Sequence, residues 1–377
     1  MPPHPDDTAV GIRDLRTCPT GTGSADHRPA GTGERPVPGR THIMDTVDAD
    51  APVTPILGLD AATTARVLAT AGRAPSLHNA QPWRFRTGAD HVELRADPAR
   101  RLPVADPTDR ELRIGCGAAL YSLRLALAGA GIRPLVTRLP DPSDPQLLAV
   151  VRRGAAMPPT PEQRRLLEAV PRRHTNRRPF SDVPVPAPAR TALTRAAYEE
   201  GAWLQLVTDP DDLAVLGRLA REAHARQSAD PAFVAEMAAW TGRHGGHDDG
   251  VPASAGGPLP APNHPWVTRD FGGPAHPRPA PAAFESAPLI AVLTSHLDGP
   301  RDDLRAGEAL ARVLLTATAE GLSASPVSQL VEVPDVRERV RRSLARDRPP
   351  QVVLRLGHGV PVPATPRRPA ADLVDPG

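Results

Sequence analysis

Apolar and polar positions alternate between helical spacing and short strand-like runs along most of the chain. In the first part, apolar residues recur at steps of three and four over residues 60–73 and 110–130, which predicts two helices. Asp60 suits the N-cap of the first helix, and Gly129 and Gly131 end the second. Short apolar runs in the same part predict strands, at residues 83–86, 91–95, 132–138 and 146–152.

The second part of the chain continues the mixture of helices and strands. Helical spacing predicts further helices, at residues 160–170, 189–200, 211–226, 231–240, 304–320 and 334–344. Strand-like runs predict strands at residues 203–208, 289–294 and 352–356. The whole pattern indicates an α+β protein.

A weak internal repeat relates the two longest predicted helices. Leu112-Arg113-Ile114-Gly115 opens one of them and Leu304-Arg305-Ala306-Gly307 opens the other. Upstream, a helix precedes Trp83 in the same way as a helix precedes Trp203. The second copy is much longer, so it carries a large insertion. The alternative is a chance similarity between two Ala-rich helices.

Composition and the internal repeat together predict the domain organisation of the chain. Residues 1–43 are rich in Pro, Gly and Thr without periodicity, so we expect a disordered extension or an upstream start, with Met44 as the natural first residue. We expect two halves, at residues 44–160 and 161–377. The second half would carry an insertion over about residues 227–283, whose Gly-, Pro- and His-rich part is either a functional lid or disordered.

The overall composition excludes several kinds of chemistry. The formal net charge is +2, so no broad cationic surface for nucleic acid or lipid is expected. All 45 residues in the Lys and Arg class are arginine, which excludes a Schiff-base lysine or a P-loop. Cys18 and Cys116 are too few for a disulfide scaffold, and we expect no metal site, His244 and His247 included. Without an apolar run long enough for a membrane span, we expect a cytoplasmic protein.

Two polar segments stand where predicted helices end. Residues 74–83 read Ala-Pro-Ser-Leu-His-Asn-Ala-Gln-Pro-Trp, and the two prolines fix the backbone of a rigid loop. This loop is either a helix-stop turn or a site for a planar polar ligand. Residues 172–180 read Arg-Arg-His-Thr-Asn-Arg-Arg-Pro-Phe, and such guanidinium groups pair with phosphate oxygens. The alternative here is a solvated basic turn.

Together these segments resemble motifs of the nitroreductase-like flavoproteins. Residues 74–83 are similar to the Pro-Ser-x-x-Asn-x-Gln-Pro-Trp element, and residues 172–180 to an Arg-Arg-x-Thr-x-Arg-Arg-Pro-Phe variant of the arginine element. Ser-Pro-Val-Ser-Gln at residues 325–329 and Pro-Gln-Val-Val-Leu-Arg-Leu-Gly at residues 350–357 narrow the resemblance to the Acg family of FMN-binding nitroreductase relatives. It covers roughly residues 60–375.

The resemblance implies an α+β nitroreductase-like fold, with mostly antiparallel sheets flanked by helices. It also implies two fused halves that mimic the family homodimer and keep one complete FMN site between them. The residues that would hold the phosphate and ribityl chain are Arg173, Thr175, Asn176 and Arg177, and the tail residues Arg367 and Arg368 would complete the phosphate clamp. The isoalloxazine would meet Ser76, Asn79 and Gln81, with the backbone of Ser325 and Pro326 against it. No catalytic side chain is implied.

Two functions fit this resemblance. One is an FMN-dependent oxidoreductase that uses NAD(P)H to reduce small nitroaromatic or quinone-like acceptors. The other is an FMN storage or sequestration protein with little turnover, in which the insertion covers the flavin through Trp240, Trp266 and Phe271. The chain would be a monomeric pseudo-dimer or pair further as a homodimer. His78 would face a substrate or fill the turn, and Cys116 would be a small core residue.

Overall fold

The computed structural model describes residues 53–88, 90–243, 246–259, 269, 271, 282–286, 288–344 and 348–375. The predictions for residues 1–43, Cys18, Met44, His244 and Trp266 lie outside these ranges.

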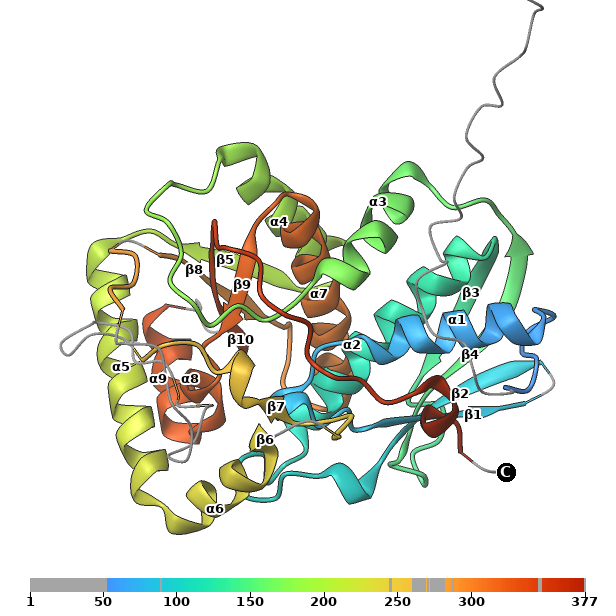
Figure 1. Ribbon diagram of the computed structural model, residues 1–377, viewed down its shortest axis with the longest axis horizontal. Helices are drawn as coiled ribbons and strands as arrows, with labels where there is room; N and C mark the ends of the chain where they lie inside the picture. The colour runs from blue at the N-terminus through green and yellow to red at the C-terminus, as the bar shows by residue number, and fades with distance from the viewer. Residues whose placement is uncertain are drawn as a thin grey trace, which may run out of the picture. The chain divides into compact units, whose positions relative to one another are not determined.

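The first half is built on an antiparallel sheet of four strands (Figure 1). The sheet order is β1 (Trp83–Thr87), β2 (His91–Ala96), β4 (Leu147–Ala156) and β3 (Ile132–Arg138). The helices of this half are α1 (Ala61–Gly72) and α2 (Arg110–Gly129), with short 3₁₀ turns η1 (Leu77–Asn79) and η2 (Pro98–Arg100). Helix α3 (Pro161–Ala169) and the 3₁₀ turn η3 (Val170–Arg172) follow β4 and lead into the second half.

The second half repeats this plan around another four-stranded antiparallel sheet. Its order is β5 (Trp203–Val207), β8 (Leu289–Thr294), β10 (Pro350–Gly357) and β9 (Ser323–Pro326). Its helices are α4 (Ala187–Glu199), α7 (Pro300–Ala319), α8 (Gln329–Glu332) and α9 (Pro334–Ser343). The connection from β5 to β8 holds α5 (Pro210–Ala229), α6 (Pro231–Trp240), the parallel pair β6 (Thr241–Arg243) and β7 (Val251–Pro252), and η4 (Ala253–Ala255).

The two sheets have equivalent connectivity. In each, the first two strands are neighbours, a long helix follows (α2 or α7), and the next two strands complete the sheet in reversed order. The halves differ at two connections. Between the first two strands the second half contains α5, α6 and the β6–β7 pair, and between its last two strands it contains α8 and α9. The larger insertion therefore begins before the Gly-, Pro- and His-rich stretch. The structure thus shows the internal repeat as matching topology.

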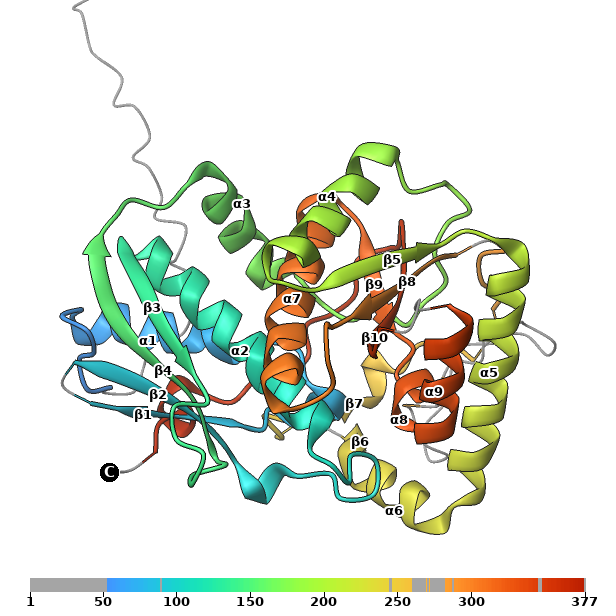
Figure 2. The ribbon, with the colours of Figure 1, turned by 180° about the vertical axis from the view of Figure 1, so that it is seen from behind.

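Helices α2 and α7 cross at two glycines in the middle of the molecule (Figure 2). A Cβ atom on Gly117 would lie 2.1 Å from the carbonyl oxygen of Leu304, and one on Gly307 would lie 2.0 Å from that of Ile114. Equivalent residues of the two helices are therefore 190 positions apart. The sequence alignment of Gly115 with Gly307 is wrong by two residues, because the close backbone approach fixes which glycines correspond.

Local sequence signals place the helix ends well. Asp60 accepts a hydrogen bond from the Thr63 amide at 2.7 Å at the start of α1. Thr160 and Gln163 form a reciprocal capping box at the start of α3. Strand β9 was not predicted, since its Ser-Ala-Ser-Pro sequence reads as a turn and forms a strand only by pairing with β10.

The chain after β10 crosses back to the first half, as the red segment in Figure 1 shows. Its turn η5 (Ala370–Leu373) packs on α1, and Val374 forms an isolated parallel bridge with Phe85. Leu373 lies so close to Gly72 that a Cβ there would be 2.7 Å from its side chain. The tail thereby fixes residues 365–368 beside the 74–83 loop.

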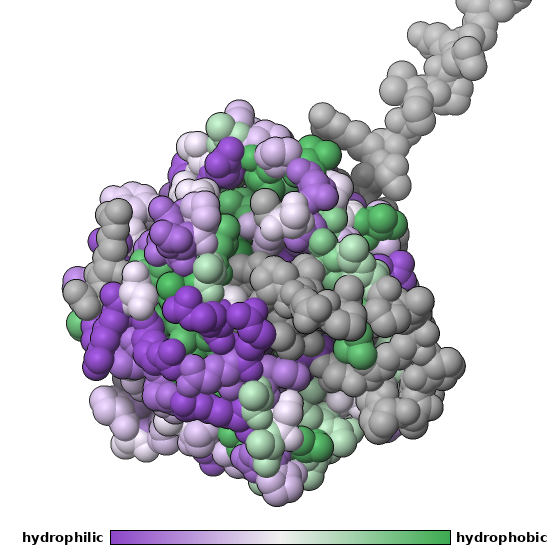
Figure 3. Space-filling view, turned by 90° about the vertical axis from the view of Figure 1, so that its left-hand side faces the viewer, coloured by the Kyte–Doolittle hydropathy of each residue, from purple (hydrophilic) through white to green (hydrophobic). Residues whose placement is uncertain are grey.

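A strongly hydrophilic patch lies on the face that carries α5 and α9 (Figure 3). Ion pairs join the two helices there, between Arg226 and Asp335 at 2.6 Å and between Arg339 and Glu222 at 2.6 Å. These exposed pairs contribute little stability individually. Among the described residues, no helix is both long and apolar enough to cross a membrane.

Candidate functional site

The 74–83 loop is held in a strained backbone conformation. His78, Asn79 and Gln81 have φ angles of 50°, 56° and 52°, in the left-handed region that side chains other than glycine seldom adopt. The Ser76 hydroxyl accepts a hydrogen bond from the backbone amide of Gln81 at 2.9 Å across the turn. Such strain persists only where the surroundings fix it, and it is common in ligand-binding loops.

Three arginines from distant parts of the chain gather next to this loop: Arg73, Arg173 and Arg367, here called the arginine triad. The Arg173 side chain donates to the Arg73 carbonyl oxygen at 3.1 Å, and Arg173 is 7% exposed. Burial and the other two cations lower the pKa of Arg367 to about 9. Burial and Arg73 lower the pKa of Arg173 to about 10.

The triad has no counter-charge in the part of the chain that the structure describes. No ion pair there joins a carboxylate to any of the three, and Nε of Arg367 is buried without a partner. The pKa of the adjacent His174 is also lowered, to about 4, by burial and by the three arginines. A cation as buried as Arg173, with two further cations beside it, is costly without a counter-charge, so this arrangement indicates an anion site.

Arg73 was missed by sequence reasoning. It is the C-cap residue of α1, directly before the 74–83 loop. A single arginine at a helix end carries no motif, in a chain where arginine is abundant. Only the fold, which brings Arg173 and Arg367 to it, reveals its place.

A small cavity of about 80 Å³ lies between the halves. Its wall includes four of the predicted site residues, Ser76, Thr175, Arg177 and Pro326. The remaining wall comes from both halves and the central helices, with Pro75, Leu77, His78, Glu111, Ile114, Gly115, Phe271, Leu310, Leu314, Ser328, Val331 and Val352.

Phe271 of the insertion covers part of this cavity. The Arg177 guanidinium lies over its ring at 4.0 Å, and the His78 ring meets it edge-on at 6.2 Å. Burial lowers the pKa of His78 to about 3, with Arg269 as a further cause. His78 is therefore a neutral wall residue near pH 7.

The insertion is fastened to the 74–83 loop by residues 246–257, here called the latch segment. Gln81 Nε2 donates to the Asp248 carbonyl at 2.8 Å, and Asn79 Nδ2 donates to that of Gly250 at 2.9 Å. The Gly250 amide donates back to the Asn79 carbonyl at 3.2 Å. On the other side, Arg177 donates to the Ala255 carbonyl at 3.1 Å.

An ion pair at 2.8 Å between Arg100 and Asp249 adds to this fastening. We expect Arg100→Gln to loosen the latch segment, so the Gly250 amide should exchange its hydrogen faster by several-fold or more. Hydrogen exchange with mass spectrometry measures this. Arg101→Gln is the matched control, because Arg101 pairs with Asp109 instead. Equal protection of Gly250 in both variants would contradict the latch.

The structure gives the other predicted ligand residues backbone partners. Asn176 donates to the Val360 carbonyl at 2.8 Å and pairs with β9, while Arg368 donates to the carbonyls of Gln81 and Trp83 at 3.3 and 3.2 Å. Ser325 is buried in β9 opposite Arg355. Arg367 and Arg368 thus lie in different environments, and only Arg367 joins the triad. Contacts of Asn176, Ser325 and Arg368 with a flavin stay predictions.

Comparison with known proteins adds independent information. No protein-family model matches the chain. A Mycobacterium tuberculosis (strain H37Rv) protein named "Putative NAD(P)H nitroreductase Rv3131" is 37% identical over 325 residues, which cover 84% of this chain and 92% of the relative. "Putative NAD(P)H nitroreductase acg" of the same strain is 32% identical over 305 residues, covering 80% and 92%.

Two solved structures show a more distant similarity. A nitroreductase with bound FMN from Bacteroides fragilis is 14% identical, with a TM-score of 0.32 and coverage of 52% of this chain and 88% of its own. A protein from Parabacteroides distasonis described as a "Putative NADH dehydrogenase/NAD(P)H nitroreductase" is 19% identical, with a TM-score of 0.30 and coverage of 54% and 91%.

Proposed function

Because this chain belongs to the nitroreductase family, we propose that it binds FMN and reduces small nitroaromatic or quinone-like acceptors with NAD(P)H. The arginine triad is the observation that carries the proposal, since it supplies buried positive charge beside a rigid polar loop. The matching strand orders further support two fused halves that mimic a family homodimer.

The triad fits the FMN phosphate by charge and by donor geometry. Guanidinium forks bind phosphate oxygens bidentately, and a dianion would offset the mutual repulsion of Arg73, Arg173 and Arg367. The orphaned Nε of Arg367 is a donor left for such a ligand. No metal is needed for this clamp.

The wall of the cavity fits an edge of the isoalloxazine. Ser76, Thr175 and Pro326 line it, and Oδ1 of Asn79 is a buried acceptor without a partner among the described residues. Ligand pockets usually measure about 300–1,000 Å³. A cavity of about 80 Å³ is much smaller, so the Phe271 side chain must withdraw for the ring to enter. When bound, FMN supplies the hydride chemistry.

We further propose that each chain binds a single FMN. At the spacing of 190 residues, Gly115 in the cavity wall corresponds to Arg305, and Leu314 corresponds to Arg124. Arg124 is bound to Glu308 and Glu200, each at 2.7 Å. The position equivalent to Leu314 is therefore held by an ion-paired arginine, where the candidate site has an apolar wall residue.

FMN storage without turnover is the second candidate, favoured by the latch segment and by Phe271 over the cavity. Anaerobic mixing of the flavin-loaded protein with NADH or NADPH separates the two functions. We expect the oxidised flavin absorbance to bleach within seconds. An unchanged spectrum with both nucleotides would contradict the reductase and favour storage, and a protein that binds no FMN would contradict both.

A further inference from the structure

Glu111 brings a carboxyl group to the cavity wall from the first turn of α2. It lines the cavity together with Ser76, Arg177 and Ser328, and its side chain is 11% exposed. No motif in the sequence singles it out. The equivalent residue of α7, 190 positions later, is Arg301. Since the two halves differ in charge at this position, the fold that they share does not require a carboxylate here.

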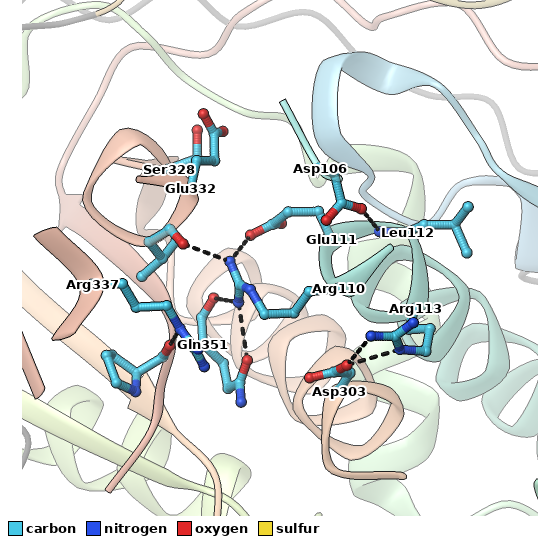
Figure 4. Close-up of polar contacts among 12 residues, drawn as sticks. Asp106, Arg110, Glu111, Leu112, Arg113, Asp303, Ser328, Glu332, Arg337 and Gln351 are labelled. Atoms are coloured by element: carbon cyan, nitrogen blue, oxygen red, sulfur yellow. Dashed lines mark hydrogen bonds and ion pairs between the residues drawn. The ribbon is translucent and has the colours of Figure 1, made fainter. Parts of the chain in front are cut away.

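Arg110 holds this carboxyl group and is itself fixed by neutral acceptors. Its guanidinium donates to Glu111 Oε1 at 2.5 Å (Figure 4). It also donates to the Gln351 carbonyl and side-chain oxygens at 2.9 and 3.0 Å, and to the Val331 carbonyl at 3.0 Å. These three bonds keep Arg110 in place whether Glu111 is charged or neutral.

The surroundings of Glu111 oppose its ionisation. Burial raises its pKa to about 7, and the neighbouring carboxylates of Asp106, Glu332 and Asp303 act in the same direction, while Arg110 acts against them. These carboxylates come from the segment before α2, from α8 and from α7. The group is therefore poised to exchange a proton near neutral pH.

The other ionisable groups in or beside the described cavity wall do not titrate near pH 7. Burial lowers the pKa of His78 to about 3 and that of Arg177 to about 10. Glu332, next to the wall residue Val331, is paired with Arg269 at 2.5 Å and has a pKa lowered to about 2. Glu111 alone among these groups changes its charge around pH 7.

We propose that Glu111 is the proton donor to the acceptor, which would share this cavity with the isoalloxazine, and this inference rests on the reductase function proposed above. A quinone becomes a hydroquinone by gaining a hydride equivalent from NAD(P)H and one proton. The O–H bond of Glu111 breaks as the proton passes to an acceptor oxygen, which leaves a carboxylate that Arg110 stabilises. Solvent then returns the proton to Glu111.

An infrared pH titration of the protein labelled with ¹³C-carboxyl glutamate tests the protonation without depending on turnover. We expect one glutamate with a midpoint near pH 7 in the wild type, absent in Glu111→Gln and retained in Glu338→Gln. Glu338 is the control because it pairs with Arg341 and Arg342 on α9, apart from the cavity wall. A wild type without a glutamate titrating near pH 7 would overturn the proposal.

The pH profile of menadione reduction tests the donor role itself. We expect wild-type turnover to fall about tenfold per pH unit above 7, and Glu111→Gln to be about 100-fold slower below pH 7 with a flat profile. Glu111→Asp should keep a sloping profile, and it replaces Glu111→Gln if that variant does not fold. An unchanged profile in Glu111→Gln overturns the donor role alone. A protein that titrates as expected but reduces neither menadione nor nitroaromatics overturns the proposed function and, with it, the donor role.

Discussion

Arg173→Ala is expected to weaken FMN binding about 100-fold or more. The variant removes the most buried of the three guanidinium groups that would hold the phosphate, and charge-assisted hydrogen bonds contribute about 1.5–3 kcal/mol each. Without ligand, the same change removes a buried cation that has no counter-charge in the described part of the chain, so electrostatic repulsion in the flavin-free protein should fall. Fluorescence titration with FMN measures the affinity, and thermal unfolding measures the stability.

Arg172→Ala is the matched control for this prediction. Arg172 adjoins Arg173, but it is exposed and donates only to the Glu168 carbonyl among the described residues. FMN affinity should stay within about twofold of the wild type. If both variants bound FMN equally well, the basic segment would act as a solvated turn and the triad would not be the phosphate site.

Gly307→Ala is expected to destabilise the protein by about 3 kcal/mol or more. The added methyl group would lie 2.0 Å from the Ile114 carbonyl oxygen, so α2 and α7 would have to separate. The higher helix propensity of alanine, worth about 1 kcal/mol, offsets only part of this cost. A denaturant titration at equilibrium measures the loss.

Gly115→Ala provides the comparison on the other central helix. Its added methyl group would meet the Ser76 Cβ atom at 3.3 Å, which needs only a small adjustment. We expect a stability change below about 1 kcal/mol there. If Gly307→Ala also changed the stability by less than about 1 kcal/mol, the helix crossing would tolerate a Cβ and the 190-residue correspondence would not rest on close packing.

Much of the fold could be predicted from periodicity and capping. The helices at Asp60 and Thr160 begin where their caps indicate, and α2 follows its apolar spacing. Strand β9 could not be predicted, because its pairing with β10 depends on tertiary contacts that no local pattern encodes. The alignment of the two repeats could not be predicted for the same reason, since only the contact between α2 and α7 identifies Gly117 and Gly307 as equivalent residues.

Site residues that belong to a sequence motif could be predicted, whereas single residues outside any motif could not. The 74–83 and 172–180 segments pointed to Ser76, Thr175 and Arg177, which the structure brings to one cavity. Arg73 and Glu111 are isolated residues at helix ends, and their roles depend on neighbours that lie far away in the sequence. Arg367 and Arg368 look alike in the sequence, but the tail directs only one of them to the triad.

The phosphate of FMN distinguishes the arginine triad from every other part of the proposed site. Titration calorimetry of the flavin-free chain with FMN, and separately with riboflavin, tests this role of the triad, since the two ligands differ only in the phosphate. We expect one FMN per chain and riboflavin binding at least about 100-fold weaker. Equal affinity for the two flavins, two FMN per chain or no binding would contradict this expectation.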